Sequence, residues 1–165
     1  MKLVYACVFA LCGLGLPATL AGAQLPPSAV LQPPCDKPAL PPVRIEAAGP
    51  SVSPAYAKFL GIWDGRWLNW QCASLAVLSV TADGRARVVY AVGGTYVAFI
   101  DHPYYYLPGR TATYEARIDA GKLKFTDNNR TYPLQISLTL RGETLVGLES
   151  LTVWPVDRPG TFTRR

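Results

Sequence analysis

One stretch near the middle of the chain, Gly61-Ile62-Trp63-Asp64-Gly65-Arg66-Trp67-Leu68-Asn69, determines how the remaining sequence is interpreted. At the two-residue period of a β-strand, its glycines and tryptophans fall on one face and Ile62, Asp64, Arg66 and Leu68 on the other. A buried indole removes on the order of 200 Å² from water, so the tryptophan face requires cover from other strands. The stretch predicts the first strand of a β domain.

Further strand patterns separated by tight turns continue to the C-terminus. The clearest is a hairpin in which Asp83-Gly84 joins residues 74–81 to residues 85–92. The other predicted strands cover residues 111–118, 122–126, 132–140, 144–153 and 160–165. A meander of short strands leaves two open edges, and closure removes them. Residues 56–165 are therefore predicted to form an all-β, eight-stranded antiparallel up-and-down barrel.

The N-terminus has the pattern of a secretory signal peptide, residues 1–23. Lys2 precedes an uncharged apolar run, and Ala21-Gly22-Ala23 is a small-residue cleavage pattern. The alternative is an uncleaved membrane anchor, because the uncharged run approaches the roughly 20 residues that span a bilayer. Cleavage would leave no stable membrane span, and we expect a bacterial exported protein, periplasmic or secreted.

Residues 24–55 are rich in proline, which removes backbone donors and fixes φ. We expect an extended arm or linker there, serving as a spacer, a disordered arm or a binding motif for a partner. Ser53 and Pro54 are placed to start a short helical turn that could plug one end of the barrel.

Cysteines and charge narrow the possible functions. Cys7 and Cys12 leave with the signal peptide, so Cys35 and Cys72 are predicted to form a disulfide in an oxidising compartment. Without a neighbouring histidine they make a poor metal site. The net charge of +5 comes from scattered basic residues and lacks the clustered stripe typical of nucleic-acid binding. No cofactor-binding motif is present in the sequence, and no catalytic residue is assigned.

Gly61-Ile62-Trp63, the eight-strand meander and Arg164 near the C-terminus together resemble the calycin superfamily, lipocalins in particular. The resemblance implies that Arg164 packs on Trp63. Trp63 and Trp67 could line a ligand cavity, but buried tryptophans in a first strand more often belong to the core, so structural roles are assigned to Gly61, Trp63, Gly65, Trp67 and Arg164. Family barrels are usually longer and carry a helix after the barrel, so the better likeness is a smaller calycin-like or avidin-like barrel. The sequence is also similar to small uncharacterised bacterial exported domains.

The segment between Gly93 and Arg110 is the longest irregular connection and is dense in aromatic residues. Loops often carry function, and tyrosine offers a flat apolar surface with a polar tip. The alternative is a strand or hairpin over residues 95–100, with the tyrosines closing the barrel end. The candidate ligand-binding residues in this segment are Tyr96, His102, Tyr104, Tyr105 and Tyr106.

Glu149 is the other candidate ligand-binding residue. If Leu145 and Leu151 point inward, Glu149 points inward with them and could bind a ligand or Arg164. The opposite register, with Val146 and Leu148 inside, places Glu149 in water. The strand pattern leaves both registers open.

Three functions follow from these observations. The first is a non-catalytic barrel that binds a small apolar or aromatic-compatible ligand, or an envelope component. The second is an accessory structural or interaction domain with a filled barrel that contacts protein or cell-wall glycan. The third is a small hydrolase whose carboxylate or histidine chemistry shows no recognisable motif.

Overall fold

The computed structural model describes residues 35–68, 71–99, 102–128, 133–151 and 157–165, with the backbone alone for 96–99 and 102–105. The fold described below belongs to one compact unit, Gln32–Arg165. The predicted signal peptide, residues 1–23, lies outside the described ranges. Within those ranges no helix has the length and apolar character to span a membrane.

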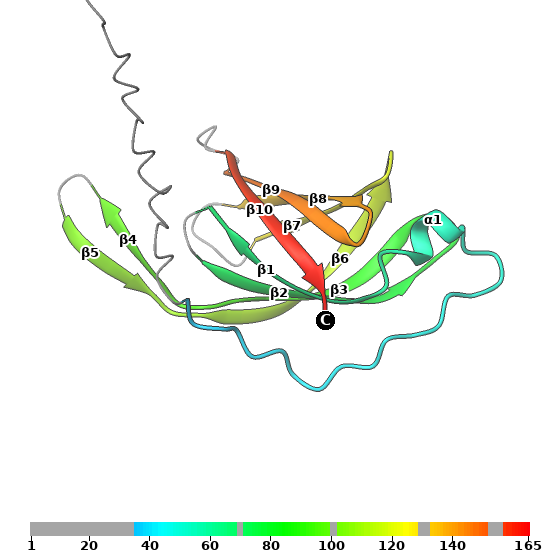
Figure 1. The fold of residues 1–165 in the computed structure, drawn as a ribbon, viewed down its shortest axis with the longest axis horizontal. Helices are drawn as coiled ribbons and strands as arrows, with labels where there is room; N and C mark the ends of the chain where they lie inside the picture. Colours follow the sequence, from blue (N-terminus) through cyan, green and yellow to red (C-terminus); the bar gives the residue numbers. More distant parts are fainter. Residues whose placement is uncertain (1–34, 69–70, 100–101, 129–132, 152–156) are drawn as a thin grey trace, which may run out of the picture. The chain divides into compact units, whose positions relative to one another are not determined.

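In the described part of the chain, eight strands form a closed antiparallel barrel (Figure 1). Each barrel strand pairs with the next one along the chain, and β1 pairs with β10 to close the ring. The predicted up-and-down barrel is confirmed. Its strands are β1 (Gly61–Trp67), β2 (Cys72–Val80), β3 (Arg85–Val92), β6 (Arg110–Asp119), β7 (Lys122–Asp127), β8 (Leu134–Arg141), β9 (Thr144–Leu151) and β10 (Asp157–Arg164).

The segment predicted as an irregular connection instead forms a second, two-stranded sheet of β4 (Thr95–Phe99) and β5 (His102–Leu107). Their antiparallel register pairs Tyr96 with Tyr106. Both segments are rich in aromatic residues, which favour strands, and pairing the two strands satisfies their backbone polar groups. The hairpin of the alternative is therefore present, with its second strand beyond the predicted residues 95–100.

The barrel interior is packed around the two tryptophans of β1. Trp63 and Trp67 are fully buried, and a Cβ added at Gly147 would lie 2.7 Å from the Trp67 ring. Gly160, which pairs with Gly147 across β9 and β10, likewise leaves room for that ring. The Trp67 indole N–H donates to the Tyr90 hydroxyl at 2.6 Å, so its polar atom has a partner inside the core.

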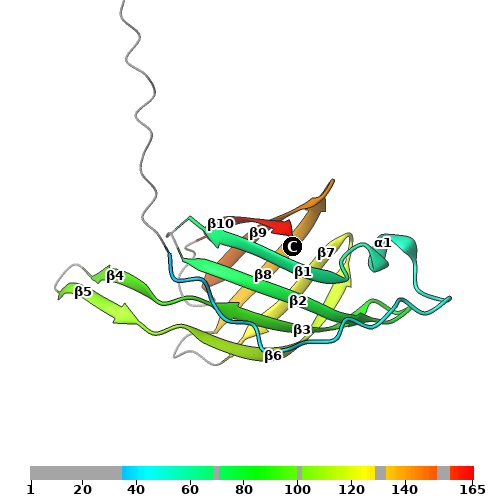
Figure 2. The same ribbon diagram turned by 60° about the horizontal axis from the view of Figure 1, so that its bottom comes forward.

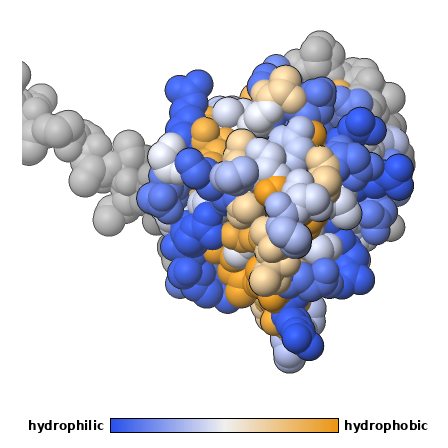
Figure 3. All heavy atoms as spheres, turned by 90° about the vertical axis from the view of Figure 1, so that its right-hand side faces the viewer, coloured by the Kyte–Doolittle hydropathy of each residue, from blue (hydrophilic) through white to orange (hydrophobic). Residues whose placement is uncertain are grey.

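One end of the barrel is closed by the short helix α1 (Pro54–Ala57) and the residues that follow it. The Ser53 hydroxyl accepts a hydrogen bond from the Ala55 N–H, as expected of a helix cap. Arg164 lies over the Trp63 ring, with 4.2 Å between its guanidinium carbon and the ring centre, and donates to the carbonyl oxygens of Lys58 and Leu60. Apolar residues gather in a band on this end, bordered by hydrophilic ones (Figure 3).

The described part of the proline-rich arm that precedes α1, residues 35–53, runs along the outside of the barrel to this helix (Figure 2). Leu40, Val43 and Ile45 pack on a second apolar cluster that includes Ala76 and Val89. The Glu46 amide donates to the Leu78 carbonyl at 2.8 Å. This cover explains why β2 is apolar on both faces.

Candidate functional site

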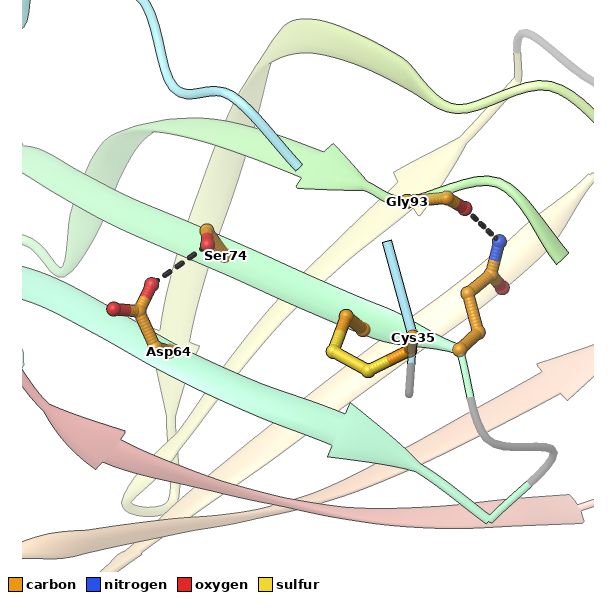
Figure 4. Close-up of a disulfide and its surroundings, with 6 residues drawn as sticks. Cys35, Asp64, Ser74 and Gly93 are labelled. Atoms are coloured by element: carbon orange, nitrogen blue, oxygen red, sulfur yellow. Dashed lines mark hydrogen bonds between the residues drawn. A yellow bond between two sulfur atoms is a disulfide. The ribbon is translucent and has the colours of Figure 1, made fainter. Parts of the chain in front are cut away.

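The ends of several strands meet at the side of the barrel opposite α1, which we call the mouth end and define by Trp67, Val92, Arg110, Asp127 and Leu134. The β4–β5 hairpin extends from this end, since it connects β3 to β6. The predicted Cys35–Cys72 disulfide is present here, with 5.5 Å between its Cα atoms. Figure 4 shows Cys35 beside β2, near the hydrogen bond that the Gln71 amide donates to the Gly93 carbonyl.

Asp127, at the end of β7, is a fully buried carboxylate at the mouth end. One of its oxygens accepts from Arg110 at 3.0 Å and from the Tyr114 hydroxyl at 2.8 Å, and the other forms an ion pair with Arg110. A buried carboxylate is costly unless it is paired and hydrogen-bonded, and this one is both. Asp127 therefore fixes the position of the Tyr114 side chain.

Glu149 points into the barrel and is fully buried, so the inward register is the correct one of the two considered. Leu145 and Gly147 share its inward face, while Val146 and Leu148 are exposed. Its ion-pair partner is Arg158, at 2.8 Å, and not Arg164, which lies at the α1 end. Two fully buried carboxylates thus lie near the mouth end, each neutralised by an arginine.

A groove of about 980 Å³ opens in the barrel wall between β6 and β7. It exists because the described β6–β7 ladder has only three residue pairs, Arg117–Lys124, Ile118–Leu123 and Asp119–Lys122, whereas β6 pairs with β3 over eight. The groove is lined by Arg85, Thr113, Tyr114, Glu115, Ala116, Arg117, Lys124, Phe125, Thr126, Asn128, Gln135, Ile136, Ser137, Leu148 and Ser150.

An aromatic pair forms part of this groove. Tyr114 of β6 and Phe125 of β7 have ring centres 5.3 Å apart, and Phe125 also packs edge-on against Tyr90 in the core. Ala116 and Ile136 belong to the same interior cluster and also line the groove. Phe125, Ala116 and Ile136 are buried, so Tyr114, which is partly exposed, is the interior residue that a ligand in the groove would contact most directly.

Of the predicted tyrosine-rich ligand site, only Tyr106 has a described side chain. It is 44% exposed, and its hydroxyl lies 3.4 Å from a carboxylate oxygen of Asp36 in the arm. The side chains of Tyr96, His102, Tyr104 and Tyr105 lie outside the described part of the structure, although their backbones belong to β4 and β5.

A charged cluster lies on the outer face of β1. Asp64 accepts from the Ser74 hydroxyl at 2.6 Å (Figure 4) and pairs with Arg165 at 2.7 Å. Partial burial acts to raise the pKa of Asp64, but the hydrogen bonds from Arg165 and Ser74 and the Arg165 charge together hold it below its ordinary value. Asp64 is thus ionised at neutral pH, and the cluster ties the C-terminus to the first strand.

Sequence reasoning missed Asp127, Arg110, Arg158 and the groove. Asp127 follows Leu123 and Phe125 at the two-residue strand period, and this spacing predicts an inward side chain. The sequence Asp127-Asn128-Asn129 is nevertheless typical of a turn, and for that reason the predicted strand ends before Asp127. Arg158 lies before the predicted last strand, residues 160–165, but the observed β10 begins three residues earlier, at Asp157, despite Pro159 and Gly160.

Comparison with known proteins adds no further assignment. No protein-family model matches the chain, and no curated protein matches it.

Proposed function

We propose that this protein is an exported, non-catalytic binding module that takes a small ligand with an apolar or aromatic body into the groove between β6 and β7. The single observation that carries the proposal is the early end of the β6–β7 ladder, which leaves Tyr114 and Phe125 at an opening in the wall. Convergent aromatic and polar side chains around a concave surface are typical of small-molecule sites.

The filled interior favours the groove over the barrel centre. Trp63, Trp67, Phe162 and Leu75 are all buried to within 1% exposure and occupy the middle of the barrel. Such packing leaves little space for a ligand of the kind that larger barrels enclose. A calycin-like ancestry is compatible with this arrangement, and the Arg164–Trp63 contact supports it.

Export is supported by the disulfide, since such bonds persist in oxidising compartments. The signal-peptide pattern of residues 1–23 points the same way. We therefore place the protein in the bacterial periplasm or outside the cell, with the proline-rich arm folded onto the barrel it precedes.

The test uses N-phenyl-1-naphthylamine, a neutral aromatic probe that fluoresces in apolar sites. Thr113 is an exposed residue of the groove, so T113W should fill the opening and abolish probe binding. T161W is the matched control, because Thr161 is an exposed outer-face residue of β10 outside the groove. Equal binding by T113W and wild type would contradict the proposal.

A second function, an accessory interaction domain with a filled barrel, is favoured by the same packed interior. It predicts that wild-type protein binds no small aromatic probe in a folded state and instead retains a protein or cell-wall glycan. Native mass spectrometry of protein purified gently from its own compartment separates the two functions, because a bound small molecule and a macromolecular partner differ in added mass.

A further inference from the structure

We propose that the ligand of the groove is an amphipathic organic anion, whose carboxylate, sulfonate or phosphate lies on a row of cations formed by Arg85, Arg117 and Lys124. This inference rests on the groove being a binding site and adds the chemical class of its ligand. The row is produced by strand register: Arg85 lies opposite Arg117, and Arg117 opposite Lys124. All three residues line the groove.

Like charges in directly opposed positions of a sheet repel each other, because their Cβ atoms lie about 5 Å apart. Arg85 and Lys124 are each offset by a local acid, with ion pairs of 2.9 Å to Asp83 and 3.1 Å to Asp119. Neither acid lines the groove. These two acids therefore only partly offset the repulsion among the three cations, because they pair with the two at the ends of the row.

Arg117, in the middle of the row, has no ion pair among the described residues. Glu115 also lines the groove, two residues before Arg117 on β6. Its cross-strand partner is Arg87 on β3. An anion bound at Arg117 would gain from three neighbouring cations and relieve their repulsion. A guanidinium suits carboxylate, sulfonate and phosphate groups through paired hydrogen bonds.

The groove also accounts for the apolar part of the ligand. The strand register continues from Lys124 on β7 to Ser137 on β8 and then to Leu148 on β9. Leu148 is 40% exposed. Tyr114 and Phe125 supply aromatic surface in the same groove, and the Asp127–Tyr114 hydrogen bond holds the phenol ring in place. Cations beside an aromatic and aliphatic surface match a molecule with a charged head and an apolar body.

The experiment compares two probes that differ by one anionic group, 8-anilinonaphthalene-1-sulfonate and N-phenyl-1-naphthylamine, by fluorescence titration and calorimetry. We expect the sulfonate to bind wild type at least about tenfold more tightly, since charge-assisted hydrogen bonds contribute on that order. Raising the salt concentration should weaken the binding of the sulfonate and leave that of the neutral probe unchanged.

The variants R117A and K124A should each weaken sulfonate binding about tenfold and weaken binding of the neutral probe much less. K122A is the matched control, because Lys122 lies on the same strand and face two residues earlier and does not line the groove. Thermal unfolding monitored by circular dichroism checks that each variant is folded.

Equal affinity for the two probes, or the same loss in K122A as in K124A, would overturn the anion proposal. That result leaves the groove as the site if T113W still blocks both probes. If T113W blocks neither, the proposed function has failed as well. Binding to vesicles of anionic phospholipid without binding of the monomeric sulfonate would also overturn the proposal of a small-molecule ligand.

Discussion

At the scale of single residues, packing inside the barrel depends on glycines that leave room for a large side chain. The Trp67 indole occupies space that glycine leaves open at Gly147 and Gly160, two residues paired across β9 and β10. A large aromatic ring beside glycine buries area that no β-branched neighbour would allow. Trp67 and these two glycines are far apart in the sequence, and the closed sheet brings them together.

Replacing Gly147 with alanine should destabilise the protein by about 1 to 3 kcal/mol, because the added methyl would lie 2.7 Å from Trp67 and 2.8 Å from Leu138. Gly49 is the control position, since nothing lies within 4 Å of a Cβ added there. Urea unfolding of G147A and G49A measures the difference. An unchanged free energy of unfolding in G147A would show that the core relaxes without cost.

The Asp64 cluster predicts a pH dependence of stability. Because folding lowers the Asp64 pKa, its contribution is fully present above the unfolded value, about 4, and is lost as the pH falls through the lower folded pKa. Wild type should exceed D64N in stability by at most about 1 kcal/mol near neutral pH, since the pair is half exposed. The gap should close in acid.

Urea unfolding of both proteins across the acid range measures this gap. R165Q removes the cation and should reproduce the loss seen in D64N. A gap that stays constant below pH 4, or that grows, would mean that Asp64 does not act through its charge.

At the scale of elements, the positions of the barrel strands could be predicted because one face of each strand is buried. Clean alternation in β6 and β7 predicted both strands, although β7 extends one residue beyond its predicted end to the buried Asp127. The register of β9 stayed open, because Leu145, Val146, Leu148 and Leu151 supply apolar residues to both faces. The buried Glu149–Arg158 pair resolves it, and that pair joins neighbouring strands that no local pattern relates.

The arm is an element whose packing was not anticipated, because proline density indicates an extended chain without indicating what it lies on. Its apolar residues, Leu40, Val43 and Ile45, cover the outer cluster at Ala76 and Val89. Since β2 reads as apolar on both faces, its outer face needed cover, and the arm supplies it.

Removing the disulfide with the double variant C35S/C72S should lower stability by up to about 4 kcal/mol, because the bond closes a loop across 37 residues. The apolar contacts should nevertheless keep the arm on the barrel. Hydrogen exchange at the Glu46 amide, which donates to Leu78, reports this directly.

We expect the Glu46 amide to remain protected in the double variant under native conditions. Exchange as fast as in an unfolded chain would show that the disulfide alone holds the arm. The Thr81 amide, which donates to Arg85 in the β2–β3 turn, serves as the internal reference for a barrel that stays folded.

At the scale of the whole molecule, the barrel is closed as a ring but incompletely sealed along one seam. The interior is packed from the α1 end to Trp67 and Tyr90, which is why the proposed binding site lies in the wall of the barrel and not at its centre. The sequence carried the three cations and both aromatic residues of the groove, but only the three-dimensional register places them together. Where a ladder between two strands stops depends on sheet curvature, which strand patterns do not contain.

The most direct test of the groove is an amide chemical-shift map of ¹⁵N-labelled protein titrated with 8-anilinonaphthalene-1-sulfonate. If the groove is the binding site, the largest shifts should cluster on facing parts of β6, β7 and β8, at Thr113, Ala116, Thr126 and Ser137. Shifts concentrated on the β4–β5 hairpin, or on β1 and β10 away from the groove, would contradict it.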